Sequence, residues 1–350
     1  MKKLLLIKLS SLGDIIFNIP LANVLQKNGY EITWLVSEKG YDVIKDNPAV
    51  KKAILIPIQK WKKRGLSIKS IFEFIKLAIE LRKEYFDIAI DSQGMFKSMQ
   101  WMLLARAKRK LVFEHSREFS TLAGNEIVKR APNPNCTTNV IIQYMQFAKY
   151  LKLEGTDEIK YTLPPVSEET KAKVDKLLQG LDKSKPMVVI CPATTWKMKH
   201  WKKDNWKAVV DAIKDKCSLV FTGTERDNDL INYISGGNFI NLAGKTQVKE
   251  LIELFSRAAL VLSPDSGSAH LARATEIPAV VTIFHCTPAT MYGPMGDPEK
   301  YYSIRGDLKC FPCHRRTCPL TGPDAGLCRK KPNPEEIINI VNKILQNVKQ

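Results

Sequence analysis

The segment that follows the first apolar run combines small residues with a single carboxylate. Ser10, Ser11 and Gly13 lie beside Asp14, and a helical pattern begins at the same point. Glycine lets a ligand approach the backbone closely, and ligands of open α/β sheets bind at the carboxyl ends of strands. The segment is therefore a candidate ligand site with Asp14 as its reactive group. A simple helix cap is the alternative, and a GxGxxG dinucleotide fingerprint is absent.

A second segment carries hydroxyls and a lysine directly after the apolar run 187–191. Thr194, Thr195 and Lys199 lie in this segment. Such groups can hold a diphosphate, because they supply hydrogen-bond donors and positive charge where leaving-group charge builds up. A solvated basic loop is the alternative interpretation.

A third segment joins the apolar run 260–262 to another helical pattern. It contains Asp265, Ser266, Gly267 and His270. The amides of Ser266 and Gly267 would lie at a helix amino terminus, which binds anions. An ordinary helix cap with a structural histidine remains the alternative.

Four cysteines are clustered near the end of the chain, in the spacing C-x2-C-x4-C-x9-C. They are Cys310, Cys313, Cys318 and Cys328. The cluster is compact enough for one tetrahedral metal site. Zinc is the chemical default, and iron stays open because the spacing is not that of the standard zinc pairs. Disulfides or free thiols are the alternative.

The composition favours an anionic partner. The 350-residue chain has 54 Lys and Arg against 36 Asp and Glu, a formal net charge of +18. A basic run at 60–64 contains Lys60, Lys62 and Arg64, for which a solvated surface is the alternative. The charge and the cysteines would also suit a nucleic-acid-binding protein. However, the charge is spread over both halves and no nucleic-acid module is recognisable, so nucleic acid is not expected as a partner.

The elements that must position these segments alternate between strand and helix patterns, which predicts an α/β fold with two parallel, doubly wound, Rossmann-like domains facing each other across a cleft. The expected strands are 4–9, 32–36, 53–56, 87–91 and 110–113, then 187–191, 218–222, 239–242, 260–262 and 279–284. The expected helices include 15–26, 68–83, 205–216, 248–256, 266–275 and 334–347.

Two features concern the membrane and the ends of the chain. The apolar start is cut by Lys8 after only four residues, which predicts a buried strand rather than a signal peptide. No apolar stretch approaches the roughly 20 residues needed to cross a bilayer. We therefore expect a cytoplasmic protein with at most peripheral contact to the inner membrane.

Taken together, four segments resemble glycosyltransferase family 9, the ADP-heptose:lipopolysaccharide heptosyltransferases. They read KLSSLGD at 8–14, IDSQGMFKS at 90–98, ATTWKMKHW at 193–201 and DSGSAH at 265–270. The segment around Gln93 looks most like heptosyltransferase I. The resemblance implies a GT-B fold and inverting transfer of a heptose from ADP-heptose to the phosphorylated Kdo-lipid A core of lipopolysaccharide. A heptosyltransferase II-like enzyme, or one that uses another nucleotide-sugar, is the alternative.

The resemblance also implies roles for individual residues. Asp14 would be the catalytic base, and Lys199 would stabilise the departing ADP without a required metal cofactor. The positions that would bind the nucleotide-sugar are Ser10, Ser11, Gly13, Thr194, Thr195, Glu225, Asp265, Ser266, Gly267 and His270. Cations and an amide would bind the acceptor, at Lys60, Lys62, Arg64, Gln93, Lys97 and Arg117.

These roles divide the chain into three parts. Residues 1–165 would bind the acceptor, and residues 166–332, with a Cys-rich loop at 308–330, would bind the nucleotide-sugar. The helix in 333–350 is expected to pack back on the first domain. One departure concerns the loop after the last expected strand, where relatives have Gly-Pro-Thr and this chain has His285-Cys286-Thr287.

Overall fold

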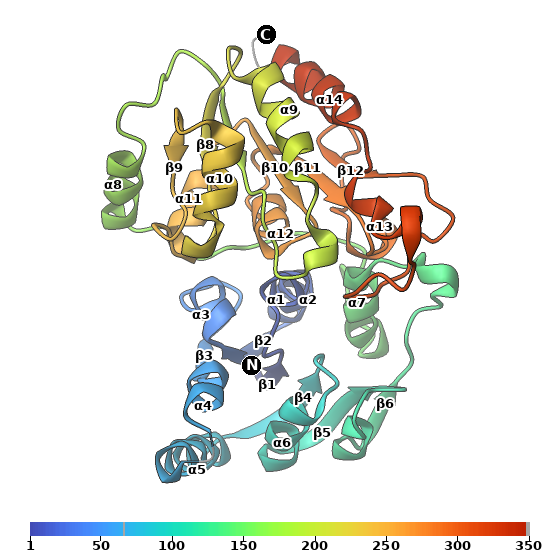
Figure 1. The fold of residues 1–350 in the computed structure, drawn as a ribbon. Coiled ribbons are helices and arrows are strands. Elements are labelled where there is room, and N and C mark those ends of the chain that lie inside the picture. The colour runs from blue at the N-terminus through green and yellow to red at the C-terminus, as the bar shows by residue number, and fades with distance from the viewer. Residues whose placement is uncertain (66, 348–350) are drawn as a thin grey trace. The chain divides into compact units, whose positions relative to one another are not determined.

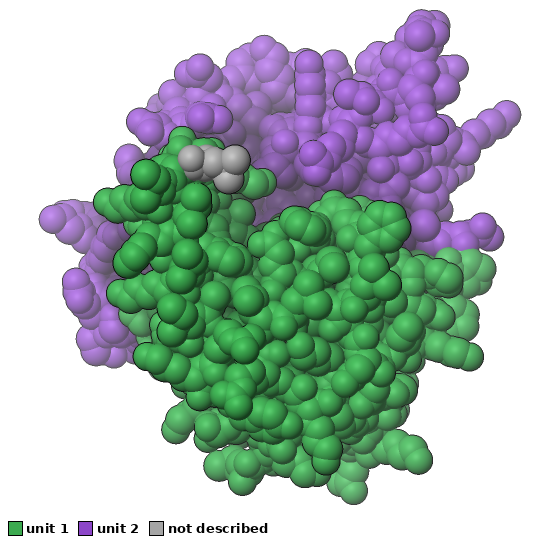
Figure 2. Space-filling view, turned by 90° about the horizontal axis from the view of Figure 1, so that it is seen from below, with its two compact units in different colours: residues 1–134, 140–165 green, residues 135–139, 166–350 purple. Residues whose placement is uncertain are grey.

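The computed structural model describes residues 1–65 and 67–347. The chain forms two compact units, shown in different colours in Figure 2. The first unit contains residues 1–134 and 140–165, and the second contains residues 135–139 and the chain from Val166 onward. The division after Pro165 follows the Pro164-Pro165 pair.

The first unit is built on a six-stranded parallel sheet in the order β3-β2-β1-β4-β5-β6 (Figure 1). Its strands are β1 Lys2–Ile7, β2 Tyr30–Ser37, β3 Lys52–Ile56, β4 Tyr85–Asp91, β5 Arg106–Phe113 and β6 Glu126–Val128. Its helices are α1 Leu12–Ile16, α2 Ile19–Lys27, α3 Glu38–Ile44, α4 Ile58–Arg64, α5 Ile68–Arg82, α6 Phe96–Leu104 and α7 Val140–Tyr150. The central strand β1 is apolar and fully buried over its last four residues, as expected for a strand covered on both faces.

The second unit repeats this plan with the order β12-β11-β10-β7-β8-β9. Its strands are β7 Met187–Ile190, β8 Ser218–Phe221, β9 Ile240–Asn241, β10 Leu260–Pro264, β11 Ala279–Phe284 and β12 Tyr301–Arg305. Its helices are α8 Glu168–Leu177, α9 Lys203–Ile213, α10 Asn228–Ser235, α11 Val248–Ser256, α12 Gly267–Ala274, α13 Ala289–Tyr292 and α14 Pro334–Asn347. In both units the strand order turns back beside the first strand, which brings the candidate segments after β1, β7 and β10 to ligand-binding ends of the sheets.

The expected helix at 15–26 is wrong in detail, because the chain forms two helices there. α1 ends at Ile16 and α2 begins at Ile19. The side chain of Asn18 donates a hydrogen bond to the carbonyl of Asp14 (2.8 Å). Pro20 lies in the first turn of α2, where its missing N–H costs nothing.

The expectation that the last helix packs on the first domain is wrong. α14 packs against α9, and its buried Ile337, Val341, Ile344 and Leu345 belong to the hydrophobic core of the second unit. An amphipathic pattern predicts that one face is buried, but it does not say which core receives it. In the described part of the chain, no helix is long and apolar enough to span a membrane.

Candidate functional site

Asp14 lies in the first turn of α1, immediately beyond β1, and both of its carboxylate oxygens have partners. Oδ2 accepts hydrogen bonds from the backbone N–H of Ser11 (3.1 Å) and from the Ser11 hydroxyl (2.9 Å). Oδ1 accepts a hydrogen bond from the hydroxyl of Tyr144 (3.4 Å) and lies 4.0 Å from Nζ of Lys8. The cap interpretation and the reactive-carboxylate interpretation are therefore compatible, because each uses a different oxygen of a side chain that is 34% exposed.

Lys8 is a buried cation directly beneath this carboxylate. Its side chain is 3% exposed, and its ammonium donates hydrogen bonds to the Tyr144 hydroxyl (2.7 Å) and to the carbonyl of Ser92 (3.2 Å). Burial lowers the pKa of Lys8, while the charges of Asp14 and Asp91 oppose that shift. This lysine supplies positive charge beside Asp14 from within the sheet.

The loop after β4 supports the same segment. Oε1 of Gln93 accepts hydrogen bonds from the backbone N–H groups of Leu9 (3.2 Å) and Ser10 (3.0 Å). The ammonium of Lys97 donates to the hydroxyl of Ser10. Burial lowers the pKa of Lys97, and the charges of Lys8 and Lys62 lower it further. Gln93 and Lys97 thus lie at the Asp14 segment, and the amide oxygen of Gln93 holds the backbone there.

The loop conformation depends on Asp91, the buried last residue of β4. Its carboxylate accepts hydrogen bonds from the backbone N–H groups of Gln93 (2.9 Å) and Gly94 (3.0 Å) and from the hydroxyl of Ser98 (2.8 Å). Burial raises the pKa of Asp91, and these hydrogen bonds oppose the shift. The nearby Arg117 is exposed, and its backbone N–H donates to the carbonyl of Gly94 (3.1 Å).

The basic run at 60–64 forms α4, and two of its cations are paired with one carboxylate of α5. Glu73 accepts a hydrogen bond from Arg64 (2.9 Å) and lies 3.5 Å from Nζ of Lys60. Arg64, followed by the indole of Trp61, lowers the pKa of Glu73 to about 2. Lys62 is exposed, and its charge acts on Lys97. Of the three predicted cations of α4, Lys62 is the one whose charge lowers the pKa of Lys97.

In the second unit, the segments after β7 and β10 meet at Asp265. Its Oδ2 accepts hydrogen bonds from Nζ of Lys199 and the hydroxyl of Thr287, both at 2.6 Å, and its Oδ1 lies 3.3 Å from Nε2 of His270. Burial would raise the pKa of Asp265, but the hydrogen bond from His270 and the charge of Lys199 hold it well below its usual range. The carboxylate therefore stays ionised and fixes the ammonium of Lys199, which is 16% exposed.

The first turn of α12 lies beside this ion pair. Ser266 is the N-cap residue and its hydroxyl accepts a hydrogen bond from the backbone N–H of Ala269 (3.4 Å). Gly267 is the first residue of the helix. The amino terminus of α12 and the ammonium of Lys199 together form a candidate anion-binding site.

Of the remaining predicted donor residues, Thr194 and Thr195 lie in the loop after β7, and Glu225 begins a 3-10 helix after β8. The hydroxyl of Thr194 donates to the carbonyl of Asp265 (3.5 Å), which joins the two segments, whereas Thr195 is exposed. Glu225 is exposed and packs against Gly244, where an added Cβ would lie only 3.2 Å from Cβ of Glu225 and where the φ of +74° favours glycine.

Comparison with known proteins identifies the family of this chain. The family model described as glycosyltransferase family 9 (heptosyltransferase) matches residues 74–322. The chain belongs to glycosyltransferase family 9. It is 28% identical over 80% of its length to a lipopolysaccharide core heptosyltransferase of Haemophilus influenzae, of which it covers 78%. It is 23% identical over 90% of its length to lipopolysaccharide heptosyltransferase 1 of Pseudomonas aeruginosa, of which it covers 87%.

Solved structures extend this result to the fold. The structure of the ADP-heptose lipopolysaccharide heptosyltransferase II of Escherichia coli matches this chain with a TM-score of 0.76 at 20% identity. The match covers 99% of this chain and 100% of the Escherichia coli chain. The expected GT-B fold is therefore confirmed, and the chain is a family 9 transferase. Because relatives of types 1 and II both match, the comparisons do not separate the types.

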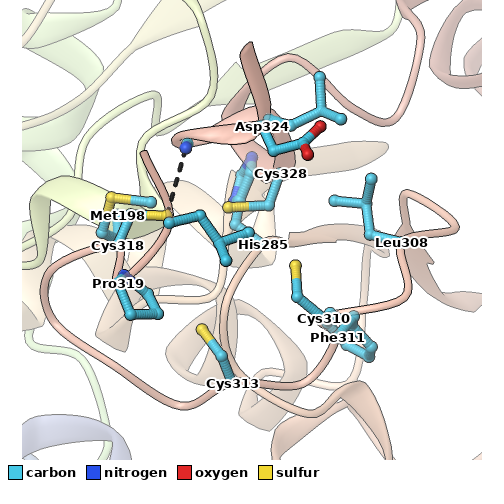
Figure 3. A pocket seen from close by; sticks show the side chains of 13 residues that line it. Met198, His285, Leu308, Cys310, Phe311, Cys313, Cys318, Pro319, Asp324 and Cys328 are labelled. Carbon is cyan, nitrogen blue, oxygen red and sulfur yellow. Dashed lines mark hydrogen bonds between the residues drawn. The ribbon is translucent and has the colours of Figure 1, made fainter. Parts of the chain in front are cut away.

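The four clustered cysteines of this family 9 protein line one cavity in the second unit (Figure 3). All four thiols are free. His285, at the end of β11, lines the same cavity, is 2% exposed, and has no hydrogen-bond partner at either ring nitrogen. Within the described residues, no three His, Cys, Asp or Glu side chains are already arranged to hold a metal ion.

The Cys-rich segment is also bonded to the segment that carries Lys199. Nε of Arg329 donates to the carbonyl of His200 (3.0 Å), and the carbonyl of Arg329 accepts from the backbone N–H of Lys202 (2.9 Å). The indole of Trp201 donates to the carbonyl of Pro332 (3.1 Å). Hydrogen bonds therefore connect the Cys-rich segment to the segment that carries Lys199.

Sequence patterns missed several members of the site. Lys8 and Tyr144 at the Asp14 carboxylate, Thr287 at Asp265, and His285 at the cysteines were not singled out for these roles. Only Lys8 carries a local signal, because a lysine at the end of an apolar central strand must find a partner when it is buried.

Proposed function

We propose that this protein transfers a heptose from ADP-heptose to the phosphorylated, Kdo-bearing lipid A core of lipopolysaccharide, as a heptosyltransferase of type I. The observation that carries the proposal is the pair of lysine–carboxylate contacts after β1 and at β10, Lys8 with Asp14 and Lys199 with Asp265. The first provides a partly exposed base and the second a fixed cation beside a helix amino terminus. The family assignment supports heptose as the transferred group.

On the acceptor side, Asp14 accepts the proton of the attacking hydroxyl through its exposed carboxylate. Ser11 holds Oδ2, so that the carboxylate cannot turn freely. Lys8 and Tyr144 place a positive charge and a hydrogen-bond donor at Oδ1 of this carboxylate.

On the donor side, the hydroxyl oxygen attacks the anomeric carbon while the bond from that carbon to the diphosphate oxygen breaks. ADP leaves with the bonding electrons, and the configuration at the anomeric carbon inverts. Lys199 and the amides of Ser266 and Gly267 stabilise the negative charge of the diphosphate. His270 and Thr287 act indirectly, because they hold the Asp265 carboxylate that positions Lys199.

The acceptor's phosphates would be bound by cations around the Asp14 segment. Lys62, Lys97 and Arg117 are the candidates, since Lys60 and Arg64 already share Glu73. The acceptor is lipid-linked, so the enzyme would work at the cytoplasmic face of the inner membrane. Nucleic acid is not proposed as a partner.

The test is a donor and acceptor screen by mass spectrometry. We expect mass addition of one heptose from ADP-heptose to Kdo-lipid A, and loss of that product when ADP-heptose is replaced by UDP- or GDP-sugars. Transfer only to an acceptor that already carries one heptose would reassign the protein to type II. Activity with another nucleotide-sugar and none with ADP-heptose would overturn the proposal.

We also propose that the Cys-rich segment binds one structural zinc or iron through Cys310, Cys313, Cys318 and Cys328. The shared cavity supports this idea, because the four thiols line it together with the buried His285, whose ring nitrogens have no hydrogen-bond partner. Transfer itself needs no metal, since Lys199 and helix amides can bear the leaving-group charge.

A further inference from the structure

The exposed surface of α5 in the first unit is unusual for a helix of a water-soluble domain. Five large apolar side chains are exposed by about half or more: Ile68 87%, Ile71 51%, Phe72 71%, Ile75 47% and Ile79 55%. At 100° per residue they fall within an arc of about 100°. They form one continuous apolar stripe along the helix, which we call the α5 stripe.

The α5 stripe is not the face that holds the helix on the sheet. That role belongs to the opposite face, where Ala78 and Leu81 are buried and Phe74 and Leu77 pack against the core. Phe74 contacts Trp61 of α4 and Trp101 of α6 at ring-centroid distances of 6.0 and 4.9 Å. A helix with an apolar stripe on both faces has more apolar surface than packing requires.

The charges of the exposed face are mainly positive. The exposed residues of α5 that are not apolar are Lys69, Lys76 and Arg82. Both acidic residues of the helix are paired with cations, Glu73 with Arg64 and Glu80, whose side chain is 45% exposed, with Lys52. The exposed face of α5 is therefore apolar with a net positive charge, because the carboxylates of Glu73 and Glu80 are each paired with a cation.

We propose that the α5 stripe docks on the surface of an anionic lipid bilayer. An apolar stripe bordered by Lys69 and Lys76 suits a helix that lies in the interface, with its apolar side chains among the acyl chains and its ammonium groups at anionic headgroups. A second copy of the chain fits less well, because a twofold interface on the stripe would bring the lysine ammonium groups of both copies into one apolar interface. The inference rests on the proposed function, since it supplies the route by which the unit carrying Asp14 reaches a lipid-linked acceptor.

The test is sedimentation with vesicles of phosphatidylethanolamine and phosphatidylglycerol, compared with phosphatidylcholine vesicles. We expect wild-type protein to bind the anionic vesicles, and the Phe72→Ser/Ile75→Ser variant to bind them about tenfold or more weakly. Ile277→Ser, which removes an apolar side chain that is 54% exposed in the second unit, is the matched control and should bind like wild type. Lys69→Glu/Lys76→Glu should also weaken binding, and more strongly at low salt.

Transfer to a deacylated, water-soluble acceptor separates this inference from the proposed function. The Phe72→Ser/Ile75→Ser variant should retain wild-type turnover with that acceptor and lose turnover with acceptor embedded in vesicles. Equal vesicle binding by wild type and this variant would overturn the docking proposal, whatever the enzyme transfers. Concentration-dependent dimerisation of wild type that the variant lacks, measured by sedimentation velocity, would assign the stripe to a second copy instead and would also overturn it.

Discussion

Asp14 uses its two carboxylate oxygens for different contacts. Oδ2 accepts a hydrogen bond from the backbone N–H of Ser11 at the start of α1. Oδ1 accepts a hydrogen bond from the hydroxyl of Tyr144 and lies near the buried ammonium of Lys8. This division fixes the carboxylate while leaving it partly exposed. It also explains why a position that looks like an ordinary helix cap can serve as a base.

We expect Asp14→Asn to fold and to bind ADP like wild type, because an amide oxygen can still accept the Ser11 hydrogen bonds. Its turnover should fall by about two to four orders of magnitude, the range for loss of a general base. Calorimetry with ADP and single-turnover mass spectrometry would measure the two effects separately. Near-wild-type turnover would mean that another group takes the proton.

The cations of α4 allow a comparison within one helix. Lys60 is already paired with Glu73, whereas the charge of Lys62 acts on Lys97 at the Asp14 segment. We therefore expect Lys62→Ala to raise the acceptor KM several-fold and Lys60→Ala to change it little, with donor KM unchanged in both. If the two variants had equal acceptor KM values, α4 would not contribute a specific phosphate contact.

At the scale of elements, the pairing of α4 with α5 depends on the charge of Glu73. Its pKa is lowered to about 2, so its carboxylate favours the folded state above its ordinary pKa of 4.5 and loses that contribution as the pH falls toward 2. Glu73→Gln should therefore be less stable than wild type at neutral pH, and the difference should shrink as the pH falls below 4.5. Thermal melts of both proteins across this range would check it, and a difference that does not shrink between pH 4.5 and pH 2 would contradict it.

The Cys-rich segment should affect the donor site through the backbone contacts of Arg329 and Trp201. A Cys313→Ser/Cys318→Ser variant should lose about one equivalent of zinc or iron by elemental analysis and should bind ADP several-fold more weakly, because Lys199 is then less well positioned. Cys136→Ser, outside the cavity, is the control and should retain both properties. Wild-type protein purified without added metal and found metal-free, with the segment still protected from protease, would rule out the metal.

The sequence predicts those parts of the architecture that depend on a local residue pattern. The apolar runs locate the central strands, and the polar segments after β1, β7 and β10 lie at strand ends as expected. The edge strands β6 and β12 were not predicted, because their residues alternate between partly buried and exposed positions and make short or half-polar runs. The partners of the site residues were not predicted either, since Tyr144 and Lys8 are 136 positions apart and meet only through the fold.

At the scale of the whole molecule, each unit has its own hydrophobic core. The core of the first unit includes Leu5, Leu81 and Trp101, and the core of the second includes Val188, Leu262 and Ile337. The proposed donor groups Lys199, Asp265 and Ser266 all belong to the second unit. A donor nucleotide should therefore stabilise the second core in preference to the first.

We expect Ile337→Ala and Leu81→Ala each to cost about 2 to 5 kcal/mol, because both side chains are almost fully buried. ADP at about 100 times its Kd adds about 2.7 kcal/mol to whichever unit binds it. Scanning calorimetry should thus show ADP offsetting the loss in Ile337→Ala while the transition lowered by Leu81→Ala stays lowered. Asn339→Ala, on the exposed face of α14, should melt like wild type. If ADP raised the melting transitions of both core variants equally, the units would unfold together or the nucleotide would bind elsewhere. The reason is that only a ligand bound to one unit stabilises that unit selectively.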